Sequence, residues 1–302
     1  MKMDISNVDG NKERYGIMCG VIAYVLWGGL PIYWKIIDMV PAYEILAHRI
    51  LWSFVFVVLI VLFKGNLNKM VIIFKDKKCL MYIALCSILI SFNWFLYIWS
   101  VTSGHIVDAS LGYYINPLMS VLLGTFVLKE KLNQYQYAAL IISVIGVLLM
   151  IVLYGNFPWI PIMLSVSFAL YGLCKKMISA DSSVGLAIET LIMTPLALAF
   201  LCFLQFNGKG FLGSSAVTTV LLILSGVVTA IPLLFFAEGA KSIKLSTLGF
   251  LQYLSPTISL IIGVFMYNEH FTQVNIIGFG FIWIALIVYS YSILKPQNAT
   301  FN

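Results

Sequence analysis

The sequence has few charged residues for its length. Only 10% of its 302 residues are charged, whereas 61% are hydrophobic. A soluble domain of this size needs many more polar residues to cover its surface, so the composition excludes an ordinary soluble fold. We therefore expect the lipid bilayer to be the solvent and the fold class to be an all-α integral membrane protein.

Motifs of soluble enzymes and of metal sites are absent as well. No G-x-S-x-G, H-E-x-x-H or phosphate-binding glycine loop occurs in the sequence. The five cysteines form no C-x-x-C pair, so we interpret them as packing residues. We expect no catalytic residue, no cofactor, no metal ion and no nucleic-acid partner, and we do not expect an enzyme.

Long apolar runs dominate what is present. A membrane-spanning helix needs roughly 20 apolar residues. About ten such runs occur, at residues 15–34, 43–63, 79–100, 106–128, 135–153, 158–177, 185–206, 217–238, 247–267 and 274–294. We therefore predict ten transmembrane helices.

Basic residues fall mainly on one side of this arrangement. If the runs alternate across the membrane, one side receives 15 of the 18 Lys and Arg residues, the other receives Lys35 and Lys209, and Arg49 lies inside a helix. Cytoplasmic loops carry such an excess, so we predict a multi-pass protein of the cytoplasmic membrane with both termini in the cytoplasm. The cytoplasmic set is Lys2, Lys12, Arg14, Lys64, Lys69, Lys75, Lys77, Lys78, Lys129, Lys131, Lys175, Lys176, Lys241, Lys244 and Lys295.

One segment occurs twice, at residues 114–130 and 253–269, with a constant offset of 139 residues. Its two copies share, in order, Tyr114/Tyr253, Pro117/Pro256, Ser120/Ser259, Gly124/Gly263 and Glu130/Glu269. We predict two repeats, residues 1–155 and 156–302, with five spans each. Because five is odd, the second repeat enters the membrane from the opposite side, so the repeats are inverted.

The two repeated prolines are predicted to interrupt their helices. Proline removes a backbone donor and collides with the preceding turn, which frees carbonyl groups. Pro117 and Pro256 are therefore predicted helix breaks that line a cavity, with a simple packing kink as the alternative. The Ser-x-x-x-Gly motif that follows each proline predicts close packing of the two repeated helices.

Polar residues near the middle of the spans are the predicted solute contacts. Such groups need a partner or a wet cavity inside a bilayer, and an ordinary interhelical hydrogen bond is the alternative for each. Asn93 and Tyr97 share one helix face with Ser100, and aromatic rings supply flat walls that suit an amphipathic organic solute. The predicted site contains Trp27, Arg49, Asn93, Tyr97, Asn116, Tyr171, Thr229 and Ser255, with Trp94 and Tyr113 as further walls.

Arg49 is a charge about two turns inside the second span. It can reach outward to the headgroups, pair with Glu44 or Asp38, or bind the anionic part of a solute. His48 lies four residues from Glu44, so those two side chains can meet. Glu189 aligns with Arg49 in the repeat, but inversion places it toward the inner side, and we expect no direct pair.

The repeated motif resembles the EamA-type repeat of the drug/metabolite transporter superfamily, over nearly the whole chain. Several stretches look like its RarD subfamily, above all residues 44–53 (Glu-Ile-Leu-Ala-His-Arg-Ile-Leu-Trp-Ser), 109–117 and 229–233. The resemblance implies ten helices around a central cavity and a secondary transporter that exports small metabolites or drugs.

Two other functions are weighed against a transporter. A channel usually has a charged ring or a carbonyl filter, and neither is visible in the sequence. An intramembrane enzyme needs clustered catalytic groups, whereas His48, His105 and His270 lie on different segments. We therefore expect a small-molecule substrate and the lipid bilayer as partners. The sequence leaves the oligomeric state open, a monomer included.

Overall fold

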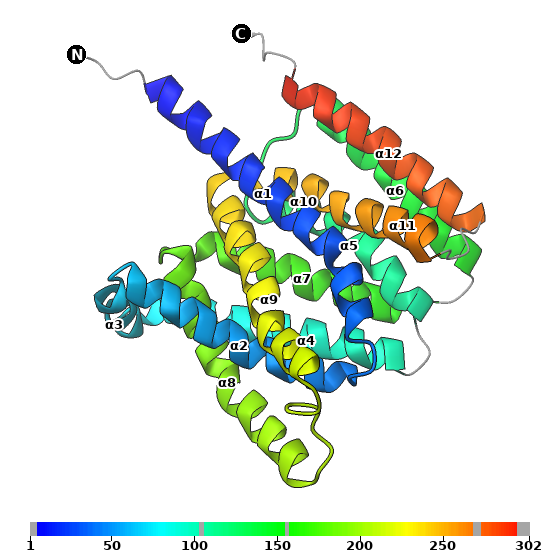
Figure 1. The fold of residues 1–302 in the computed structure, drawn as a ribbon. Helices are drawn as coiled ribbons and strands as arrows, with labels where there is room; N and C mark the ends of the chain where they lie inside the picture. The colour runs from blue at the N-terminus through cyan, green and yellow to red at the C-terminus, as the bar shows by residue number, and fades with distance from the viewer. Residues whose placement is uncertain (1–4, 103–105, 155–156, 268–272, 295–302) are drawn as a thin grey trace.

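The fold is helical throughout the part of the chain described by the computed structural model, which is residues 5–102, 106–154, 157–267 and 273–294. Those residues form no strand, and Figure 1 shows their helices. The helices are α1 (Ile5–Ile36), α2 (Ala42–Phe63), α3 (Leu67–Lys75), α4 (Lys77–Thr102), α5 (Ile106–Phe126), α6 (Gln134–Tyr154), α7 (Trp159–Met177), α8 (Ser182–Phe206), α9 (Ala216–Ser242), α10 (Leu245–Gln252), α11 (Leu254–Tyr267) and α12 (Gln273–Leu294).

Most of these helices are suited to a bilayer. Among the described residues, eight segments are long and apolar enough to cross one: α1, α2, α4, α6, α7, α8, α9 and the α10–α11 pair. Helices α5 and α12 coincide with the two remaining predicted runs, 106–128 and 274–294. Phe63, Phe206 and Phe265 are 89%, 90% and 80% exposed, as expected where lipid rather than water covers the surface. The chain is therefore a multi-pass membrane protein.

The connection between the predicted spans 43–63 and 79–100 contains a short helix, α3, that was not predicted. It is only 9 residues long, so it gave no span-length signal. The Asp76 carboxylate then accepts hydrogen bonds from the backbone N–H groups of Lys78 and Cys79, at 3.1 and 3.0 Å. Side-chain acceptors at this position satisfy donors that the first turn of α4 leaves unpaired.

The helices pack in two groups. In the larger group, α1 contacts α9 and α11, α2 contacts α8 and α9, and α4 contacts α7 and α8. Helix α5 contacts α7 and α10, while α6 lies beside α12, as Figure 1 shows. The second group, made of α5, α6, α10 and α12, has its own core. In it the rings of Phe250 and Tyr289 stack, with their centroids 3.9 Å apart.

The two repeated spans pack together through α5 and α10, whereas Ser259 of the second Ser-x-x-x-Gly motif lies on α11 and donates to the Gly28 carbonyl of α1 at 3.0 Å. The Tyr253 hydroxyl donates to the Tyr114 carbonyl at 3.4 Å, so these repeat-related residues are in direct contact. Helix α10 approaches α5 so closely that a Cβ atom at Gly249 would lie 2.9 Å from the Pro117 carbonyl oxygen. Only a residue without a side chain allows this approach.

The two prolines differ in their effect on the helix. The second copy breaks as predicted: α10 ends at Gln252, α11 begins at Leu254, and Pro256 cannot donate to the Gln252 carbonyl. In the first copy α5 runs continuously through Pro117, so the prediction of an interrupted helix there is wrong. Packing of α5 against α7 and α10 holds the helix together in spite of the missing bond.

Glu130, from the end of the first repeated segment, caps α10 in the second half. Its carboxylate accepts from Leu245 N at 2.7 Å, Ser246 N at 2.9 Å and Ser246 Oγ at 2.7 Å. The residue at the cap position itself, Lys244, makes no such bond. Its repeat mate, Glu269, lies outside the described residues.

Removing this cap is expected to destabilise the protein. Glu130→Ala leaves two backbone donors and one hydroxyl without their acceptor, so we expect a loss of about 2–3 kcal/mol. Thermal unfolding of the purified protein in detergent measures this change. Glu13→Ala, at an exposed position on α1, is the matched control. Equal unfolding temperatures for the two variants would contradict the assigned role.

Candidate functional site

Arg49 lies at the junction of four helices. It projects from α2, and its Nε donates to Thr229 Oγ1 of α9 at 2.9 Å. Its guanidinium lies over the ring of Trp34 on α1, at 4.9 Å, and over the ring of Trp94 on α4, at 4.6 Å. The structure thus brings together two of the predicted site residues, Arg49 and Thr229, and the ring of Trp94, a predicted wall, lies beside them.

Two tyrosines complete this cluster. Tyr97 of α4 and Tyr113 of α5 pack edge to face, with ring centroids 5.9 Å apart, and both interact electrostatically with Arg49. They are 38% and 45% exposed. We call Trp34, Arg49, Trp94, Tyr97, Tyr113 and Thr229 the Arg49 cluster.

Trp27 and Tyr171, both predicted contacts, belong to a neighbouring aromatic layer. Trp27 of α1 packs against Phe168 at 5.9 Å and against Phe236 at 5.5 Å. Tyr171 of α7 is fully buried and stacks on Phe236 of α9, with centroids 5.6 Å apart. This aromatic layer, made of Trp27, Phe168, Tyr171 and Phe236, fills the space between α1, α7 and α9.

Asn93 forms the interhelical hydrogen bonds that were the alternative to a solute contact. Its Nδ2 donates to the Leu164 carbonyl at 2.7 Å and to Ser167 Oγ at 2.9 Å, which ties α4 to α7. Asn93 remains half-buried. Ser100, on the same face, donates to the Leu96 carbonyl of its own helix at 2.6 Å.

Asn116 and Ser255, the two repeat-related polar residues, lie on the α5 and α11 side. Asn116 is 5% exposed, and its Oδ1 has no hydrogen-bond partner in the part of the chain that the structure describes. A buried acceptor without a partner is costly and suggests a bound water or ligand atom. Ser255 is half-buried, and its backbone lies close to α1. A Cβ atom added to Gly28 of α1 would be only 3.0 Å from the Ser255 carbonyl oxygen.

A buried ion pair lies beneath the aromatic layer. The Lys175 Nζ of α7 contacts the Glu189 Oε2 of α8, and the two side chains are 2% and 3% exposed. Lys175 also lies over the Tyr171 ring, at 5.3 Å. Glu189 therefore pairs with Lys175 and not with Arg49, in line with the expectation from the inverted repeat.

The prediction that Lys175 lies in a loop is wrong. The topology argument put it in a cytoplasmic loop, but it lies in the last turn of α7 with its side chain buried. Adjacent positions on a helix point about 100° apart, so the sequence does not show which of Lys175 and Lys176 faces the bundle. Trp34 and Phe236 were not among the predicted site residues, because the sequence does not show which side chains an aromatic residue in an apolar run contacts.

The other partners considered for Arg49 are engaged elsewhere. Glu44 Oε1 accepts from the Phe211 backbone N–H at 2.6 Å and lies 3.8 Å from His48 Nε2, which confirms the predicted meeting of Glu44 and His48. Asp38 pairs with Lys35 at 3.5 Å. Among the described residues, no carboxylate forms an ion pair with Arg49.

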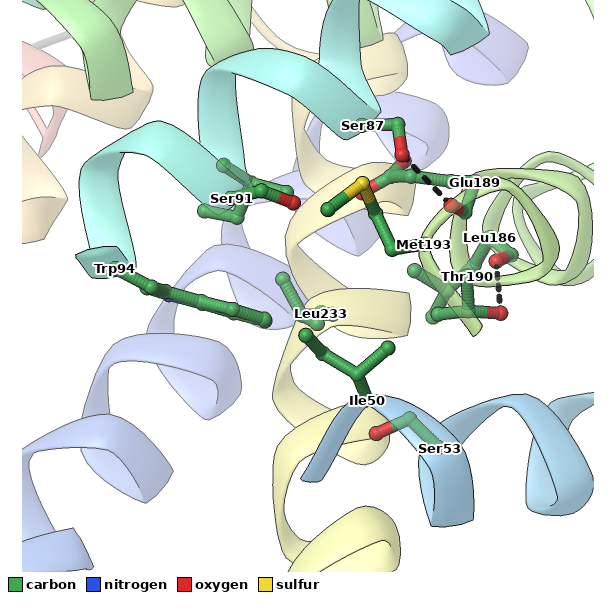
Figure 2. A pocket seen from close by; sticks show the side chains of 11 residues that line it. Ile50, Ser53, Ser87, Ser91, Trp94, Leu186, Glu189, Thr190, Met193 and Leu233 are labelled. Atoms are coloured by element: carbon green, nitrogen blue, oxygen red, sulfur yellow. Dashed lines mark hydrogen bonds between the residues drawn. The ribbon is translucent and has the colours of Figure 1, made fainter. Parts of the chain in front are cut away.

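A small cavity separates Trp94 from Glu189, as Figure 2 shows. Its volume is about 20 Å³, which is room for roughly one water molecule. The Ser87 hydroxyl at its edge already donates to the Glu189 backbone carbonyl at 2.9 Å. This cavity is therefore too small for an organic solute in the present conformation.

A larger groove of about 560 Å³ lies between α1, α2 and α9. Phe56, Ile60 and Leu234 form apolar walls, and Lys64 and Glu238 are among its charged residues. Its size is within the range of small-molecule sites. Trp94, one of the two predicted walls, lines the small cavity, but none of the eight predicted contact residues lines either the cavity or the groove.

Comparison with known proteins gives a consistent result. The EamA-like transporter family matches residues 14–152 and again residues 159–291. The “Uncharacterized transporter YojE” of Bacillus subtilis is 44% identical over 96% of this chain and 98% of that protein. “Protein RarD” of Escherichia coli is 36% identical over 97% of this chain and 99% of that protein.

The fold also has a counterpart among solved structures. One described as “Crystal structure of protein” covers 93% of this chain and 98% of its own, with a TM-score of 0.68 and 15% identity. At that identity the likeness concerns the fold alone. The family match and the two relatives, together with the apolar helices, show that the chain is a membrane transporter of the EamA-like transporter family and is related to the RarD proteins.

Proposed function

We propose that this protein is a secondary transporter that exports small organic metabolites or drugs across the cytoplasmic membrane. The observation that carries the proposal is the Arg49 cluster: a half-buried cation, surrounded by aromatic rings, where α1, α2, α4 and α9 meet. Ionisable groups inside a membrane are costly and mark solute paths. Export, rather than uptake, is what the family resemblance implies.

We propose further that residues 1–155 and 156–302 are inverted repeats and that ten helices cross the membrane. In such a repeat each span of one half has an equivalent in the other half: α1 corresponds to α7, and α4 to α9. The contact of α1 with α9 therefore corresponds to the contact of α7 with α4. In the same way the contact of α5 with α7 corresponds to the contact of α11 with α1. All four of these helix contacts are present. The hydrogen bond from Tyr253 to Tyr114 joins a residue to its own repeat mate, which supports an axis at that point.

In the orientation proposed from the lysines, both termini are cytoplasmic and the Arg49 cluster lies in the outer half of the bundle. Tyr97 and Tyr113 pack on each other beside Arg49 and remain 38% and 45% exposed. Exposed ring surface beside a cation suits a solute that has both an apolar and a charged part. We therefore place the solute here, with Asn116 and Ser255 approaching from the α5 and α11 side.

The cytoplasmic side of this chamber is closed in the proposed arrangement. Beneath the aromatic layer lies the Lys175–Glu189 pair, and Lys176 and Lys241 add further links between helices. Lys176 Nζ donates to the Ile243 carbonyl, and Lys241 Nζ donates to the Ala180 carbonyl and, at 3.1 Å, to Ser182 Oγ. Secondary transporters alternate between such one-sided states, and these contacts are the ones that must open.

Counterflow in proteoliposomes tests the proposal against a channel. The purified protein, loaded with unlabelled solute, should accumulate the same labelled solute in a saturable way, with a panel of small organic metabolites supplying candidates. Tyr97→Ala should weaken the apparent affinity by about tenfold, since a central aromatic contact is worth more than about 1 kcal/mol. Tyr137→Ala, on the exposed face of α6, is the matched control. Flux that neither saturates nor shows counterflow would favour the channel.

A further inference from the structure

We propose that the Arg49 guanidinium binds the carboxylate group of an amphipathic organic anion, whose apolar body lies against the aromatic rings of the Arg49 cluster. This inference rests on the transporter function proposed above and names the substrate class of that same site.

Arg49 carries a charge that the described part of the protein leaves uncompensated. No carboxylate forms an ion pair with it, and the two acids nearest in sequence, Glu44 and Asp38, are engaged with Phe211 and Lys35. Lys175, the buried cation beneath the aromatic layer, does have its own carboxylate in Glu189. A cation in an apolar interior needs a counter-charge, and here a solute can supply it.

The donors of Arg49 are arranged to receive a carboxylate. Thr229 accepts from Nε, which fixes the direction of the side chain, while Trp34 and Trp94 hold the guanidinium against their faces. Ring faces attract the charge but accept no conventional hydrogen bond from the N–H groups in the guanidinium plane. The two Nη groups therefore remain as a planar fork, which matches the two oxygens of a carboxylate.

The surroundings select an organic anion over a bare inorganic one. Tyr97 and Tyr113 are the accessible members of the cluster, and their rings are oriented edge to face. Aromatic surface of this kind gains free energy from burying an apolar body and nothing from chloride or phosphate. A solute with one carboxylate and a flat or branched apolar group contacts both the Arg49 guanidinium and the aromatic rings.

Matched pairs of acids and amides test this inference. Binding of 3-phenylpropionate and 3-phenylpropionamide, and of benzoate and benzamide, is measured by calorimetry on the full-length protein in lipid nanodiscs. We expect each acid to bind at least roughly tenfold more tightly than its amide, because hydrogen bonds to a charged group are about twice as strong as neutral ones. Arg49→Gln should bring the acid-to-amide ratio close to one.

Control variants separate binding from a structural role, since Arg49 also joins α1, α2, α4 and α9. Arg49→Lys keeps the charge but not the fork, so a reduced ratio above one is expected. Thr229→Val keeps Arg49 but removes the acceptor that directs its Nε, so the acid-to-amide ratio should fall. Arg14→Gln, which removes the chain's other arginine from an exposed position, should leave the ratio unchanged.

The outcomes also distinguish this inference from the transporter proposal. Equal binding of acids and amides, no binding of either acid, or a preference that survives Arg49→Gln in a folded protein would overturn the inference. Saturable counterflow of neutral solutes, unaffected by Arg49→Gln, would leave the transporter proposal standing and refute the organic-anion class.

Discussion

Gly226→Ala is expected to cause one of the largest losses of stability among single substitutions in this protein. Gly226 lies on α9 where that helix crosses α2, and a Cβ atom there would overlap backbone atoms of Trp52 and Ser53. Ser53 Oγ also donates to the Gly226 carbonyl at 2.9 Å, so the helices cannot separate without losing that bond. Overpacking and the lost hydrogen bond together predict about 3 kcal/mol of destabilisation or more.

The measurement is the yield and thermal unfolding of the purified variant in detergent, compared with Gly29→Ala. Gly29 lies on α1, and a Cβ atom there meets nothing within 4 Å. Since alanine favours a helix over glycine by about 1 kcal/mol, Gly29→Ala should be neutral or slightly stabilising. If both variants unfold at the same temperature, the close crossing of α2 and α9 does not control stability.

Glu189→Leu is the second substitution with a large expected effect. It leaves the Lys175 ammonium buried without its carboxylate, and breaking a buried pair in this way costs about 3–5 kcal/mol. Replacing both partners, as in Lys175→Met with Glu189→Leu, removes the uncompensated charge. The double variant should therefore recover most of the stability lost by the single one, which thermal unfolding measures.

The same pair of variants reports on the proposed closure of the cytoplasmic side. If the Lys175–Glu189 pair holds that side shut, the double variant should fold and yet show altered transport, with faster counterflow or a leak. A double variant with wild-type stability and wild-type transport would assign the pair no part in gating. A double variant as unstable as Glu189→Leu would contradict the charge argument itself.

The sequence predicted the membrane class and the helical segments because both follow from the run length of apolar residues. Every predicted run coincides with a described helix, including the α10–α11 pair at 247–267. The short helix α3 was missed because 9 residues fall below any spanning length. The effect of Pro117 was misjudged because packing around α5, which a sequence does not display, decides whether a helix continues through a proline.

The candidate site was only partly predictable, for a similar physical reason. A polar residue in an apolar run requires a polar partner inside the membrane. Arg49, Asn93, Asn116 and Glu189 could therefore be identified as candidate site residues from the sequence. Which partner it has depends on how helices far apart in sequence are rotated against each other. Asn93 therefore proved to bond α7, and Arg49 to meet Thr229 and two tryptophans.

Cysteine accessibility at position 97 tests the central claim, a solute chamber in the bundle that opens to each side in turn. Tyr97→Cys is placed in a protein whose five native cysteines are replaced by alanine, with Ile145→Cys on the exposed face of α6 as the control. We predict that a membrane-impermeant thiol reagent modifies position 97 from outside in intact cells and from inside in inverted vesicles, and that a transported solute slows both reactions. A Tyr97→Cys protein as unreactive as Ile145→Cys from both sides, or one whose modification no transported solute slows, would contradict the account.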